Sequence, residues 1–276
     1  MERAVIRRKA TEHDGEARDG GVQSVDRALH IIETLAEDDE GYRLSDLAVR
    51  TGLSTSTAHR LLTTLEKRRF VQFDRTESKW HVGAKSFAVG ATFTRRRNFV
   101  AQAMPYLRKL RDQTRETANL AVVDDESIMV LTRVESREIM RSLTKVGGRV
   151  AMVASGVGKA VLSTYADADV CAIIRRHGMP RLTEKSIVRA GDLFRELETV
   201  RRQGYAVDDE EACMGLRCVA AVVFNDCSEP LAAISVSGMT SRVTDKRLPE
   251  VGRAVREVAA ELTAAIGGVM PKTMAV

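Results

Sequence analysis

The chain has 276 residues and a formal net charge of +5, so it is long enough for two domains with separate hydrophobic cores. No apolar run approaches the roughly 18 residues needed to span a bilayer, and the polar N-terminus lacks the apolar centre of a secretory signal. We therefore expect a cytoplasmic protein with no membrane partner. The four cysteines lack metal-ligand spacing, which favours free thiols and predicts no metal site and no cofactor.

Residues 1–20 carry charges of both signs and few large apolar side chains. This composition is typical of disorder, so we expect a disordered arm. Apolar residues at helical spacing follow, and they predict an amphipathic helix. Its apolar stripe is expected to comprise Val25, Leu29, Ile32 and Leu35, with Ala28 and Ala36.

The next stretch reads as a winged helix-turn-helix over residues 21–83. A short helix at Ser45–Arg50 is followed by Gly52, which can adopt the positive φ of a tight turn. Ser54 is placed to cap a further helix that continues to about Arg68. Two short strands then flank residues 74–78, as expected for the wing.

The helix after Ser54 is the predicted DNA-reading element. Its leucines share one face, and Ser56 and Arg60 lie on the opposite face. Because only the N-terminal half of such a helix reaches base edges, we expect Arg60 to contact a guanine edge or a phosphate. The candidate DNA contacts are Ser54, Thr55, Ser56, Thr57, His59 and Arg60, with Arg75 and Lys79 at the wing tip.

The charge distribution supports this prediction. Between Arg43 and Arg97 there are twelve Lys and Arg residues against four Asp and Glu residues, although the whole chain carries only +5. The rest of the chain is therefore net acidic, and a polyanion such as double-stranded DNA is the natural partner of the basic segment.

Residues 84–97 are predicted to form a linker helix ending in three arginines, which either touch DNA or form a solvated junction. From residue 98 to about 270, helical and strand patterns alternate. A hairpin is expected over residues 118–134, three more strands lie between residues 204 and 237, and a closing helix covers residues 248–266. This pattern predicts a second domain of mixed α/β type, and hence an α+β protein.

The segment Gly156-Val157-Gly158-Lys159 resembles a phosphate-binding loop but fails on spacing, because Val153 stands where the first glycine is required. A helix N-terminus that can hold a carboxylate remains. His177 is the single histidine of the second domain. The domain therefore offers few side chains for acid–base or metal catalysis.

Residues 208–211 form an acidic run between two predicted strands. Cys218 follows on the second strand, and alternation places Ser235 and Ser237 on one face of the next strand. These residues either line a pocket or represent an acidic surface loop beside a core cysteine, and composition alone favours neither.

Several motifs strongly resemble the IclR family of bacterial transcriptional regulators. The resemblance covers about residues 22–266. Its motifs are Gln23–Leu29, Thr51–Ser54, Ser56–Leu62, Glu116–Leu120, Ala154–Ala160, Gly204–Glu211, Gly215–Ala221 and Ile234–Gly238. Thr55 departs from the lysine or proline of many relatives, and Ser78-Lys79 replaces the usual wing glycine.

The resemblance implies a GAF/PAS-like effector-binding and oligomerisation domain after the linker helix, homodimers that pair into tetramers, and palindromic operators. It implies small organic acids or related catabolites as effectors, and the helix N-terminus and hydroxyls suggest a small carboxylate or semialdehyde. The implied pocket uses backbone N–H groups of Gly156 and Val157. Its polar wall would comprise Asp208, Cys218, Ser235 and Ser237, and its apolar part Leu216, Val150 and Ile139.

We therefore expect a ligand-responsive regulator that represses a catabolic operon, with an activator as the alternative. A thiol-dependent enzyme fused to a DNA-binding module is the rival from another class. In that rival Cys218 would be the nucleophile, and the sequence offers it no histidine base.

Overall fold

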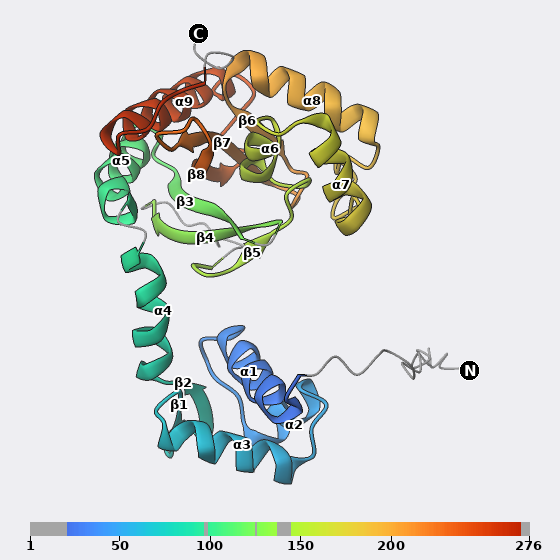
Figure 1. Cartoon of the computed structure of the whole chain (residues 1–276), viewed down its shortest axis with the longest axis vertical. Helices are drawn as coiled ribbons and strands as arrows, with labels where there is room; N and C mark the ends of the chain where they lie inside the picture. The colour runs from blue at the N-terminus through green and yellow to red at the C-terminus, as the bar shows by residue number, and fades with distance from the viewer. Residues whose placement is uncertain (1–20, 97–98, 125, 137–144, 272–276) are drawn as a thin grey trace, which may run out of the picture. The chain divides into compact units, whose positions relative to one another are not determined.

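The computed structural model describes residues 21–96, 99–124, 126–136 and 145–271 (Figure 1). The predicted arm at residues 1–20 lies outside this description. The chain divides into two compact units between Phe93 and Thr94, inside the helix α4 (Ala84–Arg96). The domain boundaries expected near residues 83 and 97 remain predictions on either side of that point.

The N-terminal unit has the predicted order of elements. They are α1 (Gln23–Ala36), α2 (Leu44–Arg50), α3 (Thr55–Lys67), β1 (Val71–Asp74), β2 (Lys79–Val82) and most of α4. The two strands pair antiparallel, with Val71 opposite Val82 and Asp74 opposite Lys79. Helix, turn, helix and ribbon therefore follow one another as a winged helix-turn-helix does.

The apolar stripe of α1 is only partly buried. Val25 and Leu29 are 55% and 54% exposed, whereas Ile31, which the predicted stripe omitted, is fully buried with Leu35. Residues 31 and 35 lie roughly 120° around the helix from residues 25 and 29. The helix therefore has two apolar strips, and only the second packs into a core shared with α2, α3 and the wing; that core contains Ile31, Leu35, Tyr42, Leu47, Leu62, Val71 and Trp80.

The wing turn is built without glycine. Ser78 takes the left-handed conformation, with φ of 55°. The Asp74 carboxylate accepts hydrogen bonds from the backbone N–H groups of Thr76 (2.7 Å) and Glu77 (3.2 Å). These hydrogen bonds stabilise the turn, which therefore forms without a glycine.

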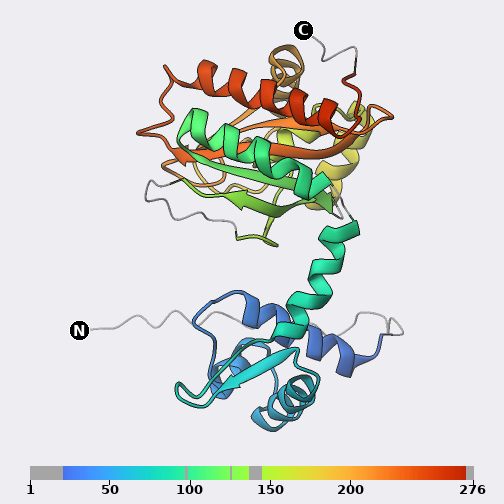
Figure 2. The same cartoon turned by 90° about the vertical axis from the view of Figure 1, so that its left-hand side faces the viewer.

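The C-terminal unit contains a six-stranded sheet of order β5-β4-β3-β8-β7-β6, in which every neighbouring pair is antiparallel. Its strands are β3 (Thr117–Asp124), β4 (Ser127–Val134), β5 (Arg149–Val150), β6 (Ala206–Asp209), β7 (Leu216–Phe224) and β8 (Pro230–Met239). Figure 2 shows α5 (Phe99–Thr114) and α9 (Leu248–Ala265) side by side on one face of this sheet.

The opposite face is covered by α6 (Gly156–Leu162), α7 (Asp167–His177) and α8 (Ala190–Gln203). Successive strand residues point to opposite faces. Val219, Ala221, Ile234 and Val236 therefore pack with α5 and α9, whereas Ala220 and Ala233 pack with the α6–α8 layer. No helix in the described ranges is long and apolar enough to cross a membrane.

Candidate functional site: a DNA-reading helix and an effector pocket

The N-terminal end of α3 is organised by Ser54. Its hydroxyl oxygen accepts the backbone N–H of Thr57 (3.2 Å) and lies 2.8 Å from the Thr57 hydroxyl. Beyond this cap, Ser56, His59 and Arg60 are exposed, whereas Ala58 and Leu62 are buried. The helix therefore presents to solvent the polar face that the sequence indicated.

Arg60 borders a shallow hollow between α3 and α1 that also contains Arg27. The sequence reasoning missed Arg27, because only the packing of α1 against α3 brings the two cations to one hollow. The remaining lining residues of this hollow are Gln23, Ser24, Thr57, Leu61 and Thr64.

The two predicted wing cations differ. Arg75 is exposed within the turn. The Lys79 side chain is only 26% exposed, and its Nζ lies 3.2 Å from a Glu77 carboxylate oxygen and 4.0 Å from one of Glu40. Arg75 is therefore the cation presented at the tip, and Lys79, the first residue of β2, is held by acidic neighbours.

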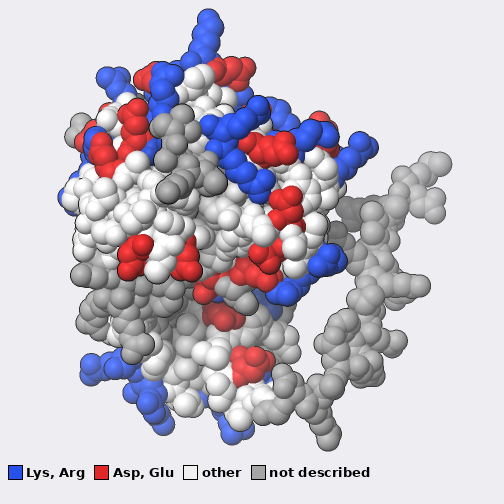
Figure 3. Space-filling view, turned by 45° about the horizontal axis from the view of Figure 1, so that its top comes forward, with Lys and Arg blue, Asp and Glu red and all other residues white. Residues whose placement is uncertain are grey.

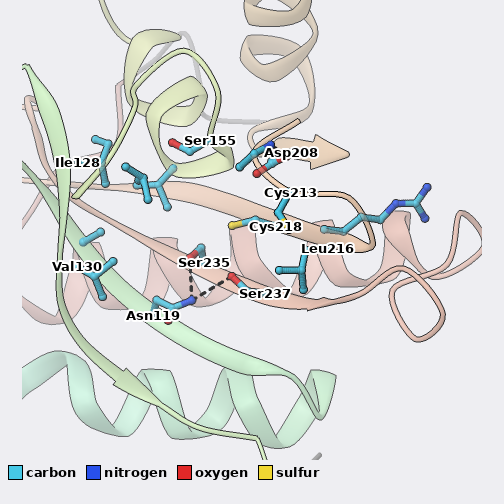
Figure 4. Close-up of a pocket in the computed structure, with 15 residues that line it drawn as sticks. Asn119, Ile128, Val130, Ser155, Asp208, Cys213, Leu216, Cys218, Ser235 and Ser237 are labelled. Atoms are coloured by element: carbon cyan, nitrogen blue, oxygen red, sulfur yellow. Dashed lines mark hydrogen bonds between the residues drawn. The ribbon is translucent and has the colours of Figure 1, made fainter. Parts of the chain in front are cut away.

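The C-terminal unit contains a cavity between the sheet and α6 (Figure 4). Most of the predicted effector residues line it, namely Val150, Val157, Asp208, Leu216, Cys218, Ser235 and Ser237. Gly156 is buried next to it, where a Cβ would lie 2.8 Å from the Cys218 carbonyl oxygen. Ile139 lies outside the described residues.

The polar floor of the cavity includes one residue that the prediction missed. The Asn119 side-chain Nδ2 donates to the hydroxyl oxygens of Ser235 (3.3 Å) and Ser237 (3.2 Å), as Figure 4 shows. A polar residue inside an otherwise apolar strand was the available signal. The other lining residues are Ala121, Ile128, Val130, Ser155, Ala212, Cys213 and Arg217.

Comparison with known proteins identifies this arrangement. A model described as IclR helix-turn-helix domain matches residues 24–75, and one described as bacterial transcriptional regulator IclR C-terminal matches residues 91–264. The chain belongs to the IclR family. The acetate operon repressor of Salmonella typhimurium is 41% identical over 251 residues, covering 90% of this chain and 92% of that protein.

Solved IclR-family structures agree with the fold. The Thermotoga maritima IclR crystal structure matches with a TM-score of 0.75 and 25% identity, covering 89% of this chain and 99% of that one. An IclR homologue from Microbacterium hydrocarbonoxydans, complexed with 4-hydroxybenzoate, has the same TM-score at 21% identity, covering 88% and 98%. This IclR-family chain is thus a DNA-binding transcriptional regulator with an effector-binding domain, and the family consists of regulators rather than enzymes.

The resemblance to a phosphate-binding loop has a structural explanation in this IclR-family chain. The Ser155 hydroxyl caps α6 by accepting the Gly158 N–H (3.1 Å). A Cβ at Gly158 would overlap the backbone of Met152. The glycine is required for close packing rather than for contact with phosphate.

Burial raises the pKa of two groups that face the cavity. Burial raises the pKa of the Asp208 carboxyl, and hydrogen bonds from the N–H groups of Glu211 (2.8 Å) and Ala212 (3.3 Å) to its Oδ1 partly oppose this. Burial also raises the pKa of the Cys218 thiol to about 11. Since the thiolate is the nucleophilic form, Cys218 is poorly suited to covalent catalysis at neutral pH.

Cations near the cavity are already paired. Arg217 donates to Asp209 (2.5 Å) and to the Val243 carbonyl (2.8 Å), and it forms an ion pair with Asp245 (2.6 Å). Over the face of the C-terminal unit seen in Figure 3, basic and acidic side chains are interspersed. Exposed ion pairs of this unit include Arg195–Asp192 and Lys109–Glu261. Within the described part of the chain, no group of three or more His, Cys, Asp or Glu is arranged to hold a metal.

Proposed function

We propose that this regulator represses a catabolic operon by binding a palindromic operator, and that a small-molecule effector in the C-terminal cavity relieves repression. The observation that carries the proposal is the cavity itself, in which Asn119, Ser235 and Ser237 form a hydrogen-bonded floor beside Asp208. A cavity with a few converging polar groups and an apolar wall is the usual form of a small-molecule site.

On the DNA side, Arg60 is proposed to read a guanine edge, with Ser56, Thr57 and His59 beside it. Ser54 and Thr55 would bind a phosphate at the positive end of α3. Arg75 would hold a flanking phosphate from the wing, and Lys79 would contribute only after leaving Glu77. We add Arg27, which borders the same hollow as Arg60, as a further phosphate contact.

On the effector side, the proposed ligand is a small carboxylate or semialdehyde. Its polar end would lie against Ser235, Ser237 and the N-terminal turn of α6 at Gly156 and Val157. Its apolar part would lie against Val150 and Leu216, with Ile139 as a further candidate. Asp208 would accept a hydrogen bond from a ligand hydroxyl. The Microbacterium homologue is complexed with 4-hydroxybenzoate, which supports a small carboxylate as the effector.

Dimerisation through the DNA-binding unit, with tetramers as pairs of dimers, is part of the proposal. Exposed apolar side chains on α1 and α4 support it, namely Val25, Leu29, Phe87 and Val89. Sedimentation of the full chain with and without a palindromic DNA fragment tests the stoichiometry, and a monomer that binds one half-site would contradict it.

Fluorescence anisotropy with labelled DNA from upstream of the neighbouring operon tests the function. Binding should weaken with salt, and at least one compound from a panel of small carboxylates and semialdehydes should release the DNA. The double substitution Ser235→Ala with Ser237→Ala should keep DNA binding and lose release. Tighter DNA binding in the presence of the compound would instead indicate an effector-activated regulator.

A further inference from the structure

Lys159 belongs to a motif that the function described above does not use. Its side chain is fully buried, although lysine is almost never buried unless it is paired. The residue lies on α6, directly behind the cavity-lining residues Ser155 and Val157. A buried ammonium in this place requires a structural reason.

The Lys159 ammonium joins three elements. Its Nζ donates to Glu211 Oε1 in the loop after β6, to the Val207 carbonyl oxygen of β6 (2.5 Å), and to Glu196 Oε1 on α8 (3.1 Å). The two sequence motifs that stood out in this domain, the glycine-lysine helix start and the acidic run, are therefore a single cluster in space.

The loop that Lys159 holds is a wall of the cavity. Asp208, Ala212 and Cys213 all line the cavity, and Asp208 pairs with Cys218 across the β6–β7 ladder. The loop is also fastened from its other side, because the Ser186 hydroxyl donates to the Glu211 carbonyl (2.8 Å). Other cations contact the segment as well, because Lys185 pairs with Asp209 and Glu210 and Arg217 pairs with Asp209. Among these three cations, Lys159 has the most deeply buried side chain.

Glu211 depends strongly on this lysine. Its Oε2 is buried and has no hydrogen-bond partner among the residues that the structure describes. Burial raises the pKa of the Glu211 carboxyl, and the Lys159 charge opposes that rise. Removing one member of a buried ion pair leaves an uncompensated buried charge, which destabilises the arrangement around the remaining group.

We propose that Lys159 is a positioning residue of the effector pocket: through Glu211 and Val207 it holds the segment 208–213 in the place where Asp208 and Cys213 border the cavity beside Cys218. This inference rests on the proposed function, because it assigns a regulatory role to the wall of that pocket. It predicts that ligand access depends on Lys159 while ligand-free DNA binding does not.

The test uses iodoacetamide, a small neutral reagent, on the full-length protein, with mass spectrometry of each cysteine. In the wild type Cys218 should react slowly, because burial raises its pKa to about 11. In Lys159→Met its alkylation should be roughly tenfold faster, as expected for a loop that opens more often. Cys171 in α7 and Cys227 between β7 and β8 should keep their wild-type rates, and so should ligand-free operator affinity.

Lys185→Met is the matched control. Lys185 pairs with Asp209 and Glu210 of the same segment from the solvent side, so its loss should leave the Cys218 rate within about twofold of wild type, as exposed ion pairs contribute little. A wild-type Cys218 rate in folded Lys159→Met would overturn the proposal. Equal acceleration at Cys171 and Cys227 would overturn it too, because it would show general loosening.

A second variant covers the case in which Lys159→Met does not fold. Lys159→Met combined with Glu211→Met removes both buried charges and replaces them with apolar groups of similar length. Positioning by the lysine predicts a fast Cys218 in this variant as well, whereas a return to the wild-type rate would show that charge compensation alone was needed. Because no effector is used, the result is independent of whether the effector itself has been identified correctly.

Discussion

The recognition helix and the effector pocket both gather polar side chains, but they do so in different ways. The polar face of α3 comes from neighbouring residues between Ser54 and Arg60, and most of it is exposed. The floor of the pocket joins Asn119 to Ser237, which are 118 positions apart, and Ser235 within it is buried. One surface follows from the period of a single helix, and the other requires that strands β3, β7 and β8 pair in register.

This difference has an energetic consequence. Groups that are exposed on α3 can be exchanged with little effect on folding, because they lose few contacts. Groups around the pocket are packed or hydrogen-bonded to one another, so their exchange changes both stability and binding. Substitutions on α3 should therefore change mainly the affinity for DNA. Substitutions around the pocket should change mainly the free energy of unfolding.

The largest expected effect is on stability in the pocket region. Gly158→Ala should lower the free energy of unfolding by about 3 kcal/mol, because the added Cβ meets the Met152 backbone. Gly191→Ala on α8, where nothing lies within 4 Å of the added Cβ, should raise it by roughly 0.5–1 kcal/mol through helix propensity. Urea denaturation measures both, and equal effects would contradict the close packing of α6.

Next in size is an affinity effect on α3. Arg60→Ala should weaken operator binding by roughly 1–3 kcal/mol and relax sequence preference, with unchanged thermal stability. Lys67→Ala, on the last turn of the same helix, is the control and should have a much smaller effect on sequence preference. If Lys67→Ala were the more damaging substitution for sequence preference, the assignment of the reading end of α3 would be wrong.

A smaller effect concerns pH and the pocket. Because burial raises the folded-state pKa of Asp208 above its ordinary value of 3.8, the folded protein holds this proton more tightly than the unfolded chain. That contribution to stability is complete below pH 3.8 and is lost as pH rises through the folded pKa. Asp208→Asn should therefore gain stability relative to wild type as pH increases. Denaturation midpoints at a series of pH values measure this, and a difference that shrinks with rising pH would contradict it.

The smallest expected effect is at the wing. Arg75→Ala should weaken binding a few-fold for specific and unrelated DNA alike, and it should reduce the slope of log K against log salt by about 1, as loss of one phosphate contact does. A change confined to the specific operator would show that the wing reads bases.

Sequence reasoning was reliable where a pattern is local. The Ser54 cap, the α3 faces, the wing and the alternation in β8 all follow from the spacing of residues along one element, and the structure contains each of them. Sequence reasoning did not decide which of the two apolar strips of α1 is buried. Val25 and Leu29 share the helical period with Ile31 and Leu35, and only packing against α2 and α3 decides which strip is buried.

The pocket shows the same limit. Cys218, Ser235 and Ser237 line the cavity, as predicted for a pocket wall. Asn119 and Arg27 were not proposed, since each reaches its place through the pairing or packing of distant elements. Likewise, Lys159 and Glu211 read as two unrelated motifs, and their ion pair exists only because α6 packs behind β6.

By itself, then, the amino-acid sequence determined the winged helix-turn-helix, the order of the strands and helices, and the face of α3 that is polar, because helix and strand periods are properties of neighbouring residues. The tertiary structure decided which side chains share a cavity, which cations are already neutralised and which groups pair with a buried lysine. These depend on strand register and layer packing, which bring together residues that no local pattern relates.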